Sequence, residues 1–376
     1  MKNDKIYLTR AIELAKKGRF TTSPNPMVGC VIVNNNKIVG EGYHFYPGEN
    51  HAEINALKMS NKLSIGATAY INLEPCFHYG KTPPCVQALV SSGISRVVFS
   101  ILDPNPKVSG KSFNYLKKIG IDVSYGLMKE ESEDLNKFFI KKMTTGFPWI
   151  SLKLATSLDG RIALKNGSSK WITSTESRND VQLYRAKNDA ILSTSSTIIK
   201  DNPLLTVRKN SLPLKIQKLY KNSFFKQPIR IIIDSSNRIN PKYKIFKNYG
   251  KILLIHLLLD NHKWLRNVKQ IIIPKYVKNK NFNYIDIIYL FKYLGSKNIN
   301  SVWIESGSNF AGNLIKLKII DELILYQSPK LLGSDSYPLF KIKGLLNINK
   351  APKFNIINFK KIGEDIRFKL KPIYKK

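Results

Sequence analysis

The sequence predicts an α/β protein made of two domains. The chain has 376 residues, which at about 150 residues per domain is enough for two hydrophobic cores. Helix-like and strand-like segments alternate along it, the pattern of sheets covered by helices. Gly146-Phe147-Pro148 interrupts the alternation, so we expect domains at residues 1–145 and 146–376.

The first domain is expected to open with a helix over residues 5–17. Leu8, Ala11 and Ala15 recur there at helical spacing, and Gly18 ends the pattern. The expected strands are residues 28–33, 37–43, 67–73, 96–101 and 121–125. The other expected helices start at His51 and Pro84 or span residues 111–119 and 130–142.

The second domain repeats the mixture with more strands. Helices are expected near residues 175–187 and 310–317. The predicted strands are residues 149–155, 189–193, 229–234, 252–258, 301–305 and 322–326. Residues 209–228 and 260–285 are rich in Lys and Asn and lack a clear period, so they are expected to be loops.

The composition excludes several classes of protein. Hydrophobic residues make up 43% and charged residues 23%, as in globular proteins rather than disordered or fibrous ones. No apolar run reaches the roughly 18 residues of a membrane span, and no apolar segment follows Met1–Lys5 as in a secretory signal. The three cysteines are too few for a disulfide framework, so we expect a reducing, cytoplasmic location.

The positive charge has two readings. The formal net charge is +35, of which residues 1–145 carry +7 and residues 146–376 carry +28. A basic domain suggests an anionic partner such as nucleic acid. The alternative is drift in an A/T-biased genome, because Lys, Asn and Ile, which have A/T-rich codons, are abundant together. The basic residues are scattered without interleaved aromatics, which argues against a stacking surface for nucleic acid.

A metal site is predicted in the first domain. His51-Ala52-Glu53 is followed by Pro75-Cys76, and Cys85 lies nine positions after Cys76. One imidazole and two thiolates give zinc three ligands and leave a fourth position for a water that the metal acidifies. Glu53, two residues from His51, can then take the proton of that water and return it to a leaving amine.

A structural zinc site is the main alternative. Such a site needs a fourth protein ligand, for which His44 and His78 are the nearby candidates. Cys30 lies inside a predicted buried strand and is expected to pack in the core, because a free Cys behaves as a small hydrophobe. The His-x-Glu pattern with Pro-Cys and a further Cys is typical of zinc-dependent base deaminases, although their two cysteines are usually separated by two residues.

Further motifs make the resemblance specific. The stretches Thr21-Thr22-Ser23-Pro24-Asn25-Pro26, Gly40-Glu41-Gly42-Tyr43-His44 and Asp103-Pro104-Asn105-Pro106 resemble the riboflavin-pathway pyrimidine deaminases. The segment from Leu73 to Cys85 is similar to the cysteine segment of that family and accounts for the long gap between the two cysteines.

This resemblance implies a cytidine-deaminase-like domain with three layers. The implied substrate is a diaminopyrimidinone ribosylamine phosphate whose ring 2-amino group is replaced by a carbonyl. By the same resemblance His51, Cys76 and Cys85 are zinc ligands and Glu53 is the proton shuttle. Asn25 and His44 are expected to line the base pocket.

The rest of the chain resembles the reductase half of the bifunctional riboflavin-pathway enzymes. The matching stretches are Ser157–Arg161, Ser169–Thr173, Ser195–Thr197, Asp201–Arg208 and Pro329–Gly333. The resemblance implies a dihydrofolate-reductase-like α/β domain that uses NADPH to reduce the ribosyl group to ribityl. It also implies a homodimer that acts on a small molecule, with no nucleic-acid or membrane partner.

Roles in the second domain follow from the matched motifs. The expected NADPH contacts are Ala155, Trp171, Thr197, Asp201, Ser235, Gly307, Ser308, Asn309, Phe310, Ala311, Gly312 and Asn313. The expected substrate contacts are Ser169, Arg185, Leu205, Arg208 and Glu305. Lys153 and Asp201 are expected to handle protons during the reduction.

The glycine-containing turn after the strand at residues 301–305 is a weaker signal. Gly307 and Gly312 can let backbone and helix N-terminus approach a phosphate, although an ordinary strand–helix turn has the same pattern. Members of the family often have Gly or Ala where this chain has Ser306. The sequence has no Gly-x-Gly-x-x-Gly fingerprint of a standard dinucleotide fold.

Two other functions remain open at this point. A tRNA or nucleic-acid deaminase would keep the zinc site and use the basic second domain to grip RNA, with salt-dependent binding. A binding protein with a structural zinc and no turnover is the third reading. Glu53 beside an open coordination position argues against it.

Overall fold

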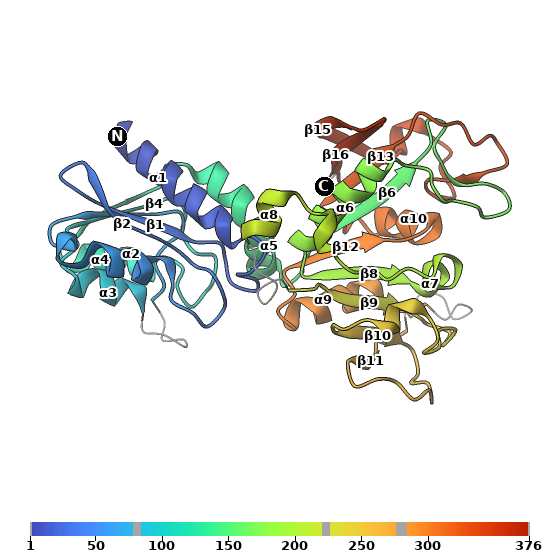
Figure 1. The fold of residues 1–376 in the computed structure, drawn as a ribbon, viewed down its shortest axis with the longest axis horizontal. Helices are drawn as coiled ribbons and strands as arrows, with labels where there is room; N and C mark the ends of the chain where they lie inside the picture. Colours follow the sequence, from blue (N-terminus) through green and yellow to red (C-terminus); the bar gives the residue numbers. More distant parts are fainter. Residues whose placement is uncertain (1, 78–83, 220–225, 276–283, 375–376) are drawn as a thin grey trace. The chain divides into compact units, whose positions relative to one another are not determined.

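The computed structural model describes residues 2–77, 84–219, 226–275 and 284–374 (Figure 1). The chain forms two compact units, Met1–Phe147 and Pro148–Lys376, and each is described separately. Unit 1 therefore ends two residues beyond the domain boundary expected from the sequence.

A five-stranded sheet in the order β2-β1-β3-β4-β5 forms the centre of unit 1. Its strands are β1 (Gly29–Asn34), β2 (Lys37–Tyr43), β3 (Thr68–Ile71), β4 (Arg96–Phe99) and β5 (Asp122–Tyr125). β1 runs antiparallel to both neighbours, whereas β3, β4 and β5 are mutually parallel. The chain leaving β3 and the chain leaving β4 therefore emerge at the same edge.

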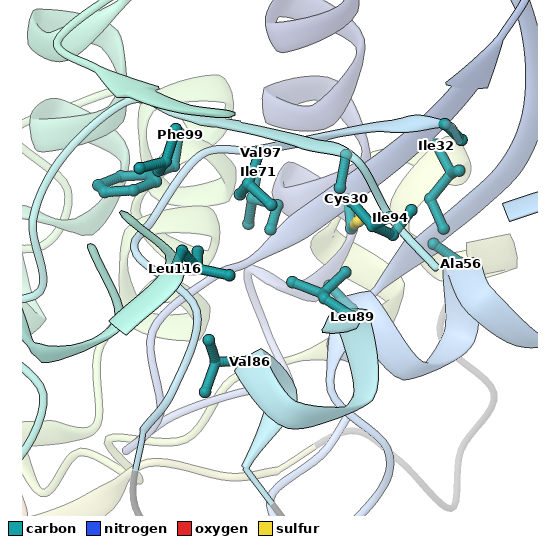
Figure 2. Packing of buried hydrophobic residues seen from close by; sticks show 14 residues of the cluster. Cys30, Ile32, Ala56, Ile71, Val86, Leu89, Ile94, Val97, Phe99 and Leu116 are labelled. Carbon is teal, nitrogen blue, oxygen red and sulfur yellow. The ribbon is translucent and has the colours of Figure 1, made fainter. Parts of the chain in front are cut away.

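Helices cover both faces of this sheet and make the three layers that were expected. They are α1 (Lys2–Ala15), α2 (Ala52–Ser60), α3 (Cys85–Ser91), α4 (Lys111–Lys118) and α5 (Lys129–Thr145). Because successive strand residues point to opposite faces, Cys30 and Ile32 join the core with α2 and α3, and Val31 and Val33 join the core with α1. Figure 2 shows the first core, where Cys30 is fully buried, as predicted.

Gly42 allows α2 to lie close to β2. A Cβ at this position would sit 2.2 Å from the carbonyl oxygen of Ala52, a backbone atom that cannot move without shifting the helix. We expect Gly42→Ala to destabilise unit 1 by about 1–3 kcal/mol, the usual effect of overpacking. Thermal unfolding measures this. Gly307→Ala is the control because its Cβ would meet no atom within 4 Å. Equal unfolding temperatures for G42A and the unaltered protein would contradict the packing argument.

Unit 2 contains a nine-stranded sheet in the order β11-β10-β9-β8-β12-β6-β13-β16-β15. Its parallel strands are β6 (Trp149–Thr156), β8 (Ala190–Thr194), β9 (Ile229–Ile233), β10 (Ile252–His256), β11 (Val268–Ile272), β12 (Ser301–Glu305) and β13 (Glu322–Gln327). The hairpin of β15 (Lys353–Ile362) and β16 (Asp365–Ile373) adds antiparallel to β13. β7 (Arg161–Ala163) and β14 (Tyr337–Pro338) pair separately.

The helices of unit 2 complete an α/β arrangement around this sheet (Figure 1). They are α6 (Thr175–Lys187), α7 (Ser195–Asp201), α8 (Leu214–Leu219), α9 (Ile287–Ser296) and α10 (Ser308–Lys316). Trp303 is fully buried in the core and stacks on Tyr184 of α6. Among the helices that the structure describes, none has the length and hydrophobicity needed to cross a membrane.

The expectation of loops at residues 209–228 and 260–285 is wrong in part. The first range contains α8, and the second contains β11, an edge strand. Lys269 and Gln270 lie within β11, so its hydrophobic pattern is weak, while its backbone pairs with β10 in parallel register. Residues 220–225 and 276–283 of these ranges lie outside the described residues.

Candidate active sites

His51, Cys76 and Cys85 meet in unit 1. His51 is the residue that caps the start of α2, and Cys85 is the first residue of α3. Nδ1 of His51 lies 3.2 Å from Sγ of Cys85 and 3.5 Å from Sγ of Cys76. Zinc bonds of about 2.0–2.3 Å place neighbouring ligand atoms roughly 3.5 Å apart, so this donor set fits a zinc ion.

The electrostatics of the two thiols favour a thiolate at Cys76. Hydrogen bonding with the Cys85 side chain and with His51 lowers the pKa of Cys76 to about 4. The backbone N–H of Cys85 also donates to Sγ of Cys76, at 3.2 Å. Interaction with Cys76 and burial raise the pKa of Cys85. Cys85 begins α3, whereas Cys76 lies outside the helices, and only its sulfur reaches the N-terminus of α3.

Glu53 lies beside the three ligands in the first turn of α2. Its side chain is 3% exposed and interacts with the Cys85 thiol. Burial, helped by the charge on Cys76, raises the pKa of the Glu53 carboxyl. A carboxyl with a raised pKa can both accept and return a proton near neutral pH, which suits general acid–base chemistry.

Asn25 and His44 lie together next to this cluster. Nδ2 of Asn25 is 3.0 Å from Nε2 of His44, and the rings of His44 and His51 pack edge to face at 5.2 Å. Nδ1 of His44 is 3.1 Å from the carbonyl oxygen of Asn50, so both of its ring nitrogens already have partners. The described residues thus offer zinc three ligands, and His78, the other candidate for a fourth, lies outside them.

A large pocket opens in unit 2 where parallel strands end. Its volume is about 1370 Å³, and its wall includes residues at the carboxyl ends of β6, β8, β9 and β12. Ligands of parallel α/β sheets bind at this edge. Ten Lys and Arg side chains but only three Asp and Glu side chains line the pocket, so it attracts anionic groups such as phosphates.

The pocket gathers nearly all residues predicted for the second site. Its wall contains Lys153, Ala155, Ser169, Trp171, Arg185, Thr197, Asp201, Leu205, Arg208, Ser235, Glu305, Gly307, Ser308, Asn309, Phe310 and Asn313. Ala311 and Gly312 are buried and lie outside the lining set. A Cβ at Gly312 would sit 2.5 Å from the carbonyl oxygen of Lys341, so this glycine serves chain packing rather than phosphate approach.

The turn before α10 fits a phosphate-bearing cofactor. A Cβ at Gly307 would meet no protein atom within 4 Å, so the space in front of this residue is open. Within the described residues no side chain caps the start of α10, so the backbone N–H groups of its first turn are available to a ligand. Oγ of Ser306 is buried and has no hydrogen-bond partner in the described part of the chain. Hence these residues offer unused donors at the pocket wall.

Arg185 and Glu305 form an ion pair in the pocket wall. The Arg185 guanidinium donates to both carboxylate oxygens of Glu305, at 2.6 and 2.9 Å, and to the carbonyl oxygen of Thr206 at 2.9 Å. Burial raises the pKa of Glu305, but the charges of Arg185 and Lys153 outweigh it and hold the pKa at about 2. Glu305 therefore stays ionised and holds Arg185 in place.

Burial disfavours the charged form of three further residues of the pocket wall, Lys153, Asp201 and Arg208. Burial lowers the pKa of the Lys153 ammonium and raises that of the Asp201 carboxyl, and the charge of each acts on the other. Burial, together with Arg185 and Arg178, lowers the pKa of Arg208. The described residues give Arg208 no carboxylate partner, in contrast to Arg185. Leu205 has a backbone φ of +49°, a strained conformation of the kind found at binding sites.

Several basic residues on the pocket wall were not predicted. They are Lys170, Arg178, Lys200, Arg238, Lys316, Lys341 and Lys343. Arg178 lies seven residues before Arg185 on α6, and this spacing places both side chains on one helix face. That signal was present in the sequence. Lys341 and Lys343 lie in no helix or strand, so no periodic pattern in the sequence marked them.

Comparison with known proteins agrees with this geometry. Residues 1–101 match the family model for the cytidine and deoxycytidylate deaminase zinc-binding region, and residues 148–368 match the RibD C-terminal domain. The riboflavin biosynthesis protein RibD of Buchnera aphidicola is 53% identical over 97% of both chains. The chain belongs to the RibD family. The RibD of Escherichia coli is 48% identical over 96% of this chain and 98% of its own length.

Solved structures of RibD proteins have the same fold. The RibD of Acinetobacter baumannii has a TM-score of 0.89 at 36% identity and 99% coverage of both chains. A diaminohydroxyphosphoribosylaminopyrimidine deaminase/5-amino-6-(5-phosphoribosylamino)uracil reductase of Thermotoga maritima has a TM-score of 0.85 at 31% identity, again with 99% coverage of both chains. These findings confirm the predicted fold class and the predicted bifunctional deaminase and reductase of riboflavin biosynthesis.

Membership of the family also identifies the two cofactors and bears on the alternative functions that the sequence left open. A RibD protein has a zinc-binding deaminase domain and a reductase domain that uses NADPH, as predicted. The second unit is thus a reductase domain, and the chain is an enzyme rather than a binding protein with a structural zinc.

Proposed function

We propose that unit 1 deaminates 2,5-diamino-6-ribosylamino-4(3H)-pyrimidinone 5′-phosphate and that unit 2 then reduces the ribosyl side chain of the product. The final product would be 5-amino-6-ribitylaminouracil 5′-phosphate. The observation that carries this proposal is the cluster of His51, Cys76 and Cys85 with Glu53 buried beside it. The second, basic pocket supports it, because both the substrate and NADPH carry phosphate groups.

Each residue of the candidate site in unit 1 has a role in the proposed deamination. Zinc held by His51, Cys76 and Cys85 supplies, when bound, a water with a lowered pKa at its open position. Glu53 accepts a proton at its carboxylate and delivers it to the departing amino group, which leaves as ammonia. Asn25 and His44, held against each other, line the pocket for the ring of the base.

In the proposed reduction, the residues of the pocket in unit 2 would surround the opened ribose of the substrate. NADPH, when bound, supplies the hydride that C1′ receives. Lys153 and Asp201 hold and move the accompanying proton. The cofactor would contact Ser306, the Gly307 turn, Ala155, Trp171, Thr197 and Ser235 of the pocket wall. The substrate would contact Ser169, Leu205 and Glu305. Arg208 binds the sugar phosphate and Arg185 supports that end of the site, since Glu305 already engages two of its nitrogens.

Removing zinc is expected to separate the two activities. Dialysis against a chelator should abolish ammonia release and leave NADPH oxidation on the deaminated intermediate unchanged, because the ligands and the pocket belong to different units. Metal analysis should give one zinc per chain, and adding Zn²⁺ back should restore ammonia release. Ammonia release that persists in fully demetallated protein would overturn the zinc assignment.

We also propose a cytoplasmic homodimer that binds no nucleic acid. Three free cysteines fit a reducing compartment. The edge strand β15 carries exposed apolar side chains at Ile356, Ile357 and Phe359, which a second copy of the chain would cover. Light scattering should give twice the chain mass of 42.9 kDa. A monomer at micromolar concentration would exclude the dimer.

A further inference from the structure

Glu74 is a buried carboxylate that four backbone groups surround. Its side chain is 2% exposed and lies just beyond β3, two residues before Cys76. Oε2 accepts hydrogen bonds from the backbone N–H groups of Asp103, at 3.1 Å, and Gly110, at 2.9 Å. Oε1 accepts from the backbone N–H groups of Ser112, at 3.1 Å, and Phe113, at 3.2 Å. One side chain thus ties the segment after β3 to the loop after β4 and to the first turn of α4.

The neighbouring residue is held to the same helix. Oγ of Ser112 donates to the carbonyl oxygen of Pro75 at 2.7 Å, and Ser112 is fully buried. The backbone N–H of Glu74 donates to the carbonyl oxygen of Ile101 at 2.9 Å. The chain leading into Cys76 is therefore fixed by its backbone on both sides of the Glu74–Pro75 bond.

The arrangement requires a carboxylate and not merely a polar side chain. All four groups that point at Glu74 are donors, and an ionised carboxyl has only acceptors. A glutamine of the same shape would place its own NH₂ group against two of them and leave those N–H groups unpaired in the interior. Such a clash costs free energy and forces the segment to move.

We infer that Glu74, together with Ser112, is a positioning residue for the deaminase centre, fixing Cys76 relative to His51 and Cys85. This inference rests on the proposed role of Cys76 as a zinc ligand. Groups beyond the ligands set metal affinity because they hold ligand atoms to within a fraction of an ångström. Glu74 acts through the backbone of Cys76 and does not touch the substrate.

The test compares Glu74→Gln with a matched control, Asp4→Asn. Asp4 is also a buried carboxylate of unit 1, at 8% exposure, but it lies in α1 on the other face of the sheet and accepts from Tyr70 and Arg96. Zinc affinity is measured by titrating full-length protein against a chromophoric chelator. The Co²⁺-substituted proteins report ligand geometry through their absorption bands, and reductase activity reports on the integrity of the chain.

E74Q is expected to weaken zinc binding roughly 10–100-fold, to alter the Co²⁺ bands and to leave reductase activity unchanged. D4N should bind zinc within about twofold of the unaltered protein, even if both variants lose similar stability. Equal zinc affinity in E74Q and the unaltered protein, or equal weakening in E74Q and D4N, would overturn the inference. Failure of the unaltered protein to bind zinc would instead overturn the proposed function.

Ser112→Ala keeps the inference testable if E74Q does not fold. This variant removes only the bond to Pro75 and should weaken zinc binding in the same direction by a smaller factor. Unchanged zinc affinity and unchanged Co²⁺ bands in S112A would then contradict the positioning role.

Discussion

Replacing Glu53 by Gln is expected to lower the rate of ammonia release by roughly 10²–10⁴-fold, the usual contribution of a general acid–base group. The reason is that Glu53 is buried beside the three metal ligands, where its raised pKa lets it take and return a proton. Gln keeps the shape of the side chain but cannot carry the proton. Ammonia released from the diaminopyrimidinone substrate, measured without NADPH, gives the rate.

Two controls separate catalysis from damage. E53Q should retain about one zinc per chain and full reductase activity on the deaminated intermediate. Glu41→Gln removes another partly buried carboxylate of unit 1, which pairs with Arg10 at 2.6 Å, and should leave ammonia release within a few-fold of the unaltered rate. If E53Q deaminates as fast as E41Q, another group must move the proton.

Lys153→Met should cause the largest loss in the other half of the enzyme, again roughly 10²–10⁴-fold, in NADPH oxidation. Lys153 lies on the pocket wall, and the charges of Glu305, Arg185 and Asp201 act on it. Met fills a similar volume without a proton to give. Ammonia release should be unchanged, because the zinc cluster belongs to unit 1. Lys165→Met, at an exposed lysine paired with Asp335, serves as the control.

The pH dependence of the reductase tests the same assignment. Burial lowers the pKa of Lys153 from its ordinary value of 10.5, with Arg185 acting in the same direction. A lysine that donates a proton acts in its protonated form, which is lost as pH rises through the lowered pKa. NADPH oxidation at saturating substrate should therefore fall at a pH below 10.5, and K153M should lack this alkaline limb. The same limb in K153M would assign it to a different group.

Local spacing in the sequence is enough to predict the zinc cluster. His51 and Glu53 are two residues apart, Cys76 follows a short strand and Cys85 starts a helix, so residue type and sequence distance carry the signal. The role of Glu74 has no such signal. Its four partners lie 29 to 39 residues away and offer only backbone N–H groups, which every residue except proline has.

In the reductase pocket, some contacts could not be predicted from the sequence because the residues that make them are far apart along the chain. Arg185 and Glu305 are separated by 120 residues, and nothing in their local sequence predicts a bidentate pair. Gly312 suggested phosphate approach, yet it faces the backbone of Lys341, because a glycine has the same appearance in both uses. The hairpin of β15 and β16 was missed because apolar residues occur on exposed positions of β15, which blurs the alternation of a half-buried strand.

The bifunctional assignment is tested most directly by one assay with two readouts on the full-length, zinc-loaded protein. The diaminopyrimidinone ribosylamine phosphate is supplied with and without NADPH, and ammonia and NADPH are followed separately. We expect ammonia in both cases, with NADPH oxidised one-for-one after ammonia release. Ammonia without NADPH oxidation would contradict the reductase assignment of unit 2, and NADPH oxidation without ammonia would contradict the order of the two reactions. No ammonia from zinc-loaded protein would contradict the substrate itself.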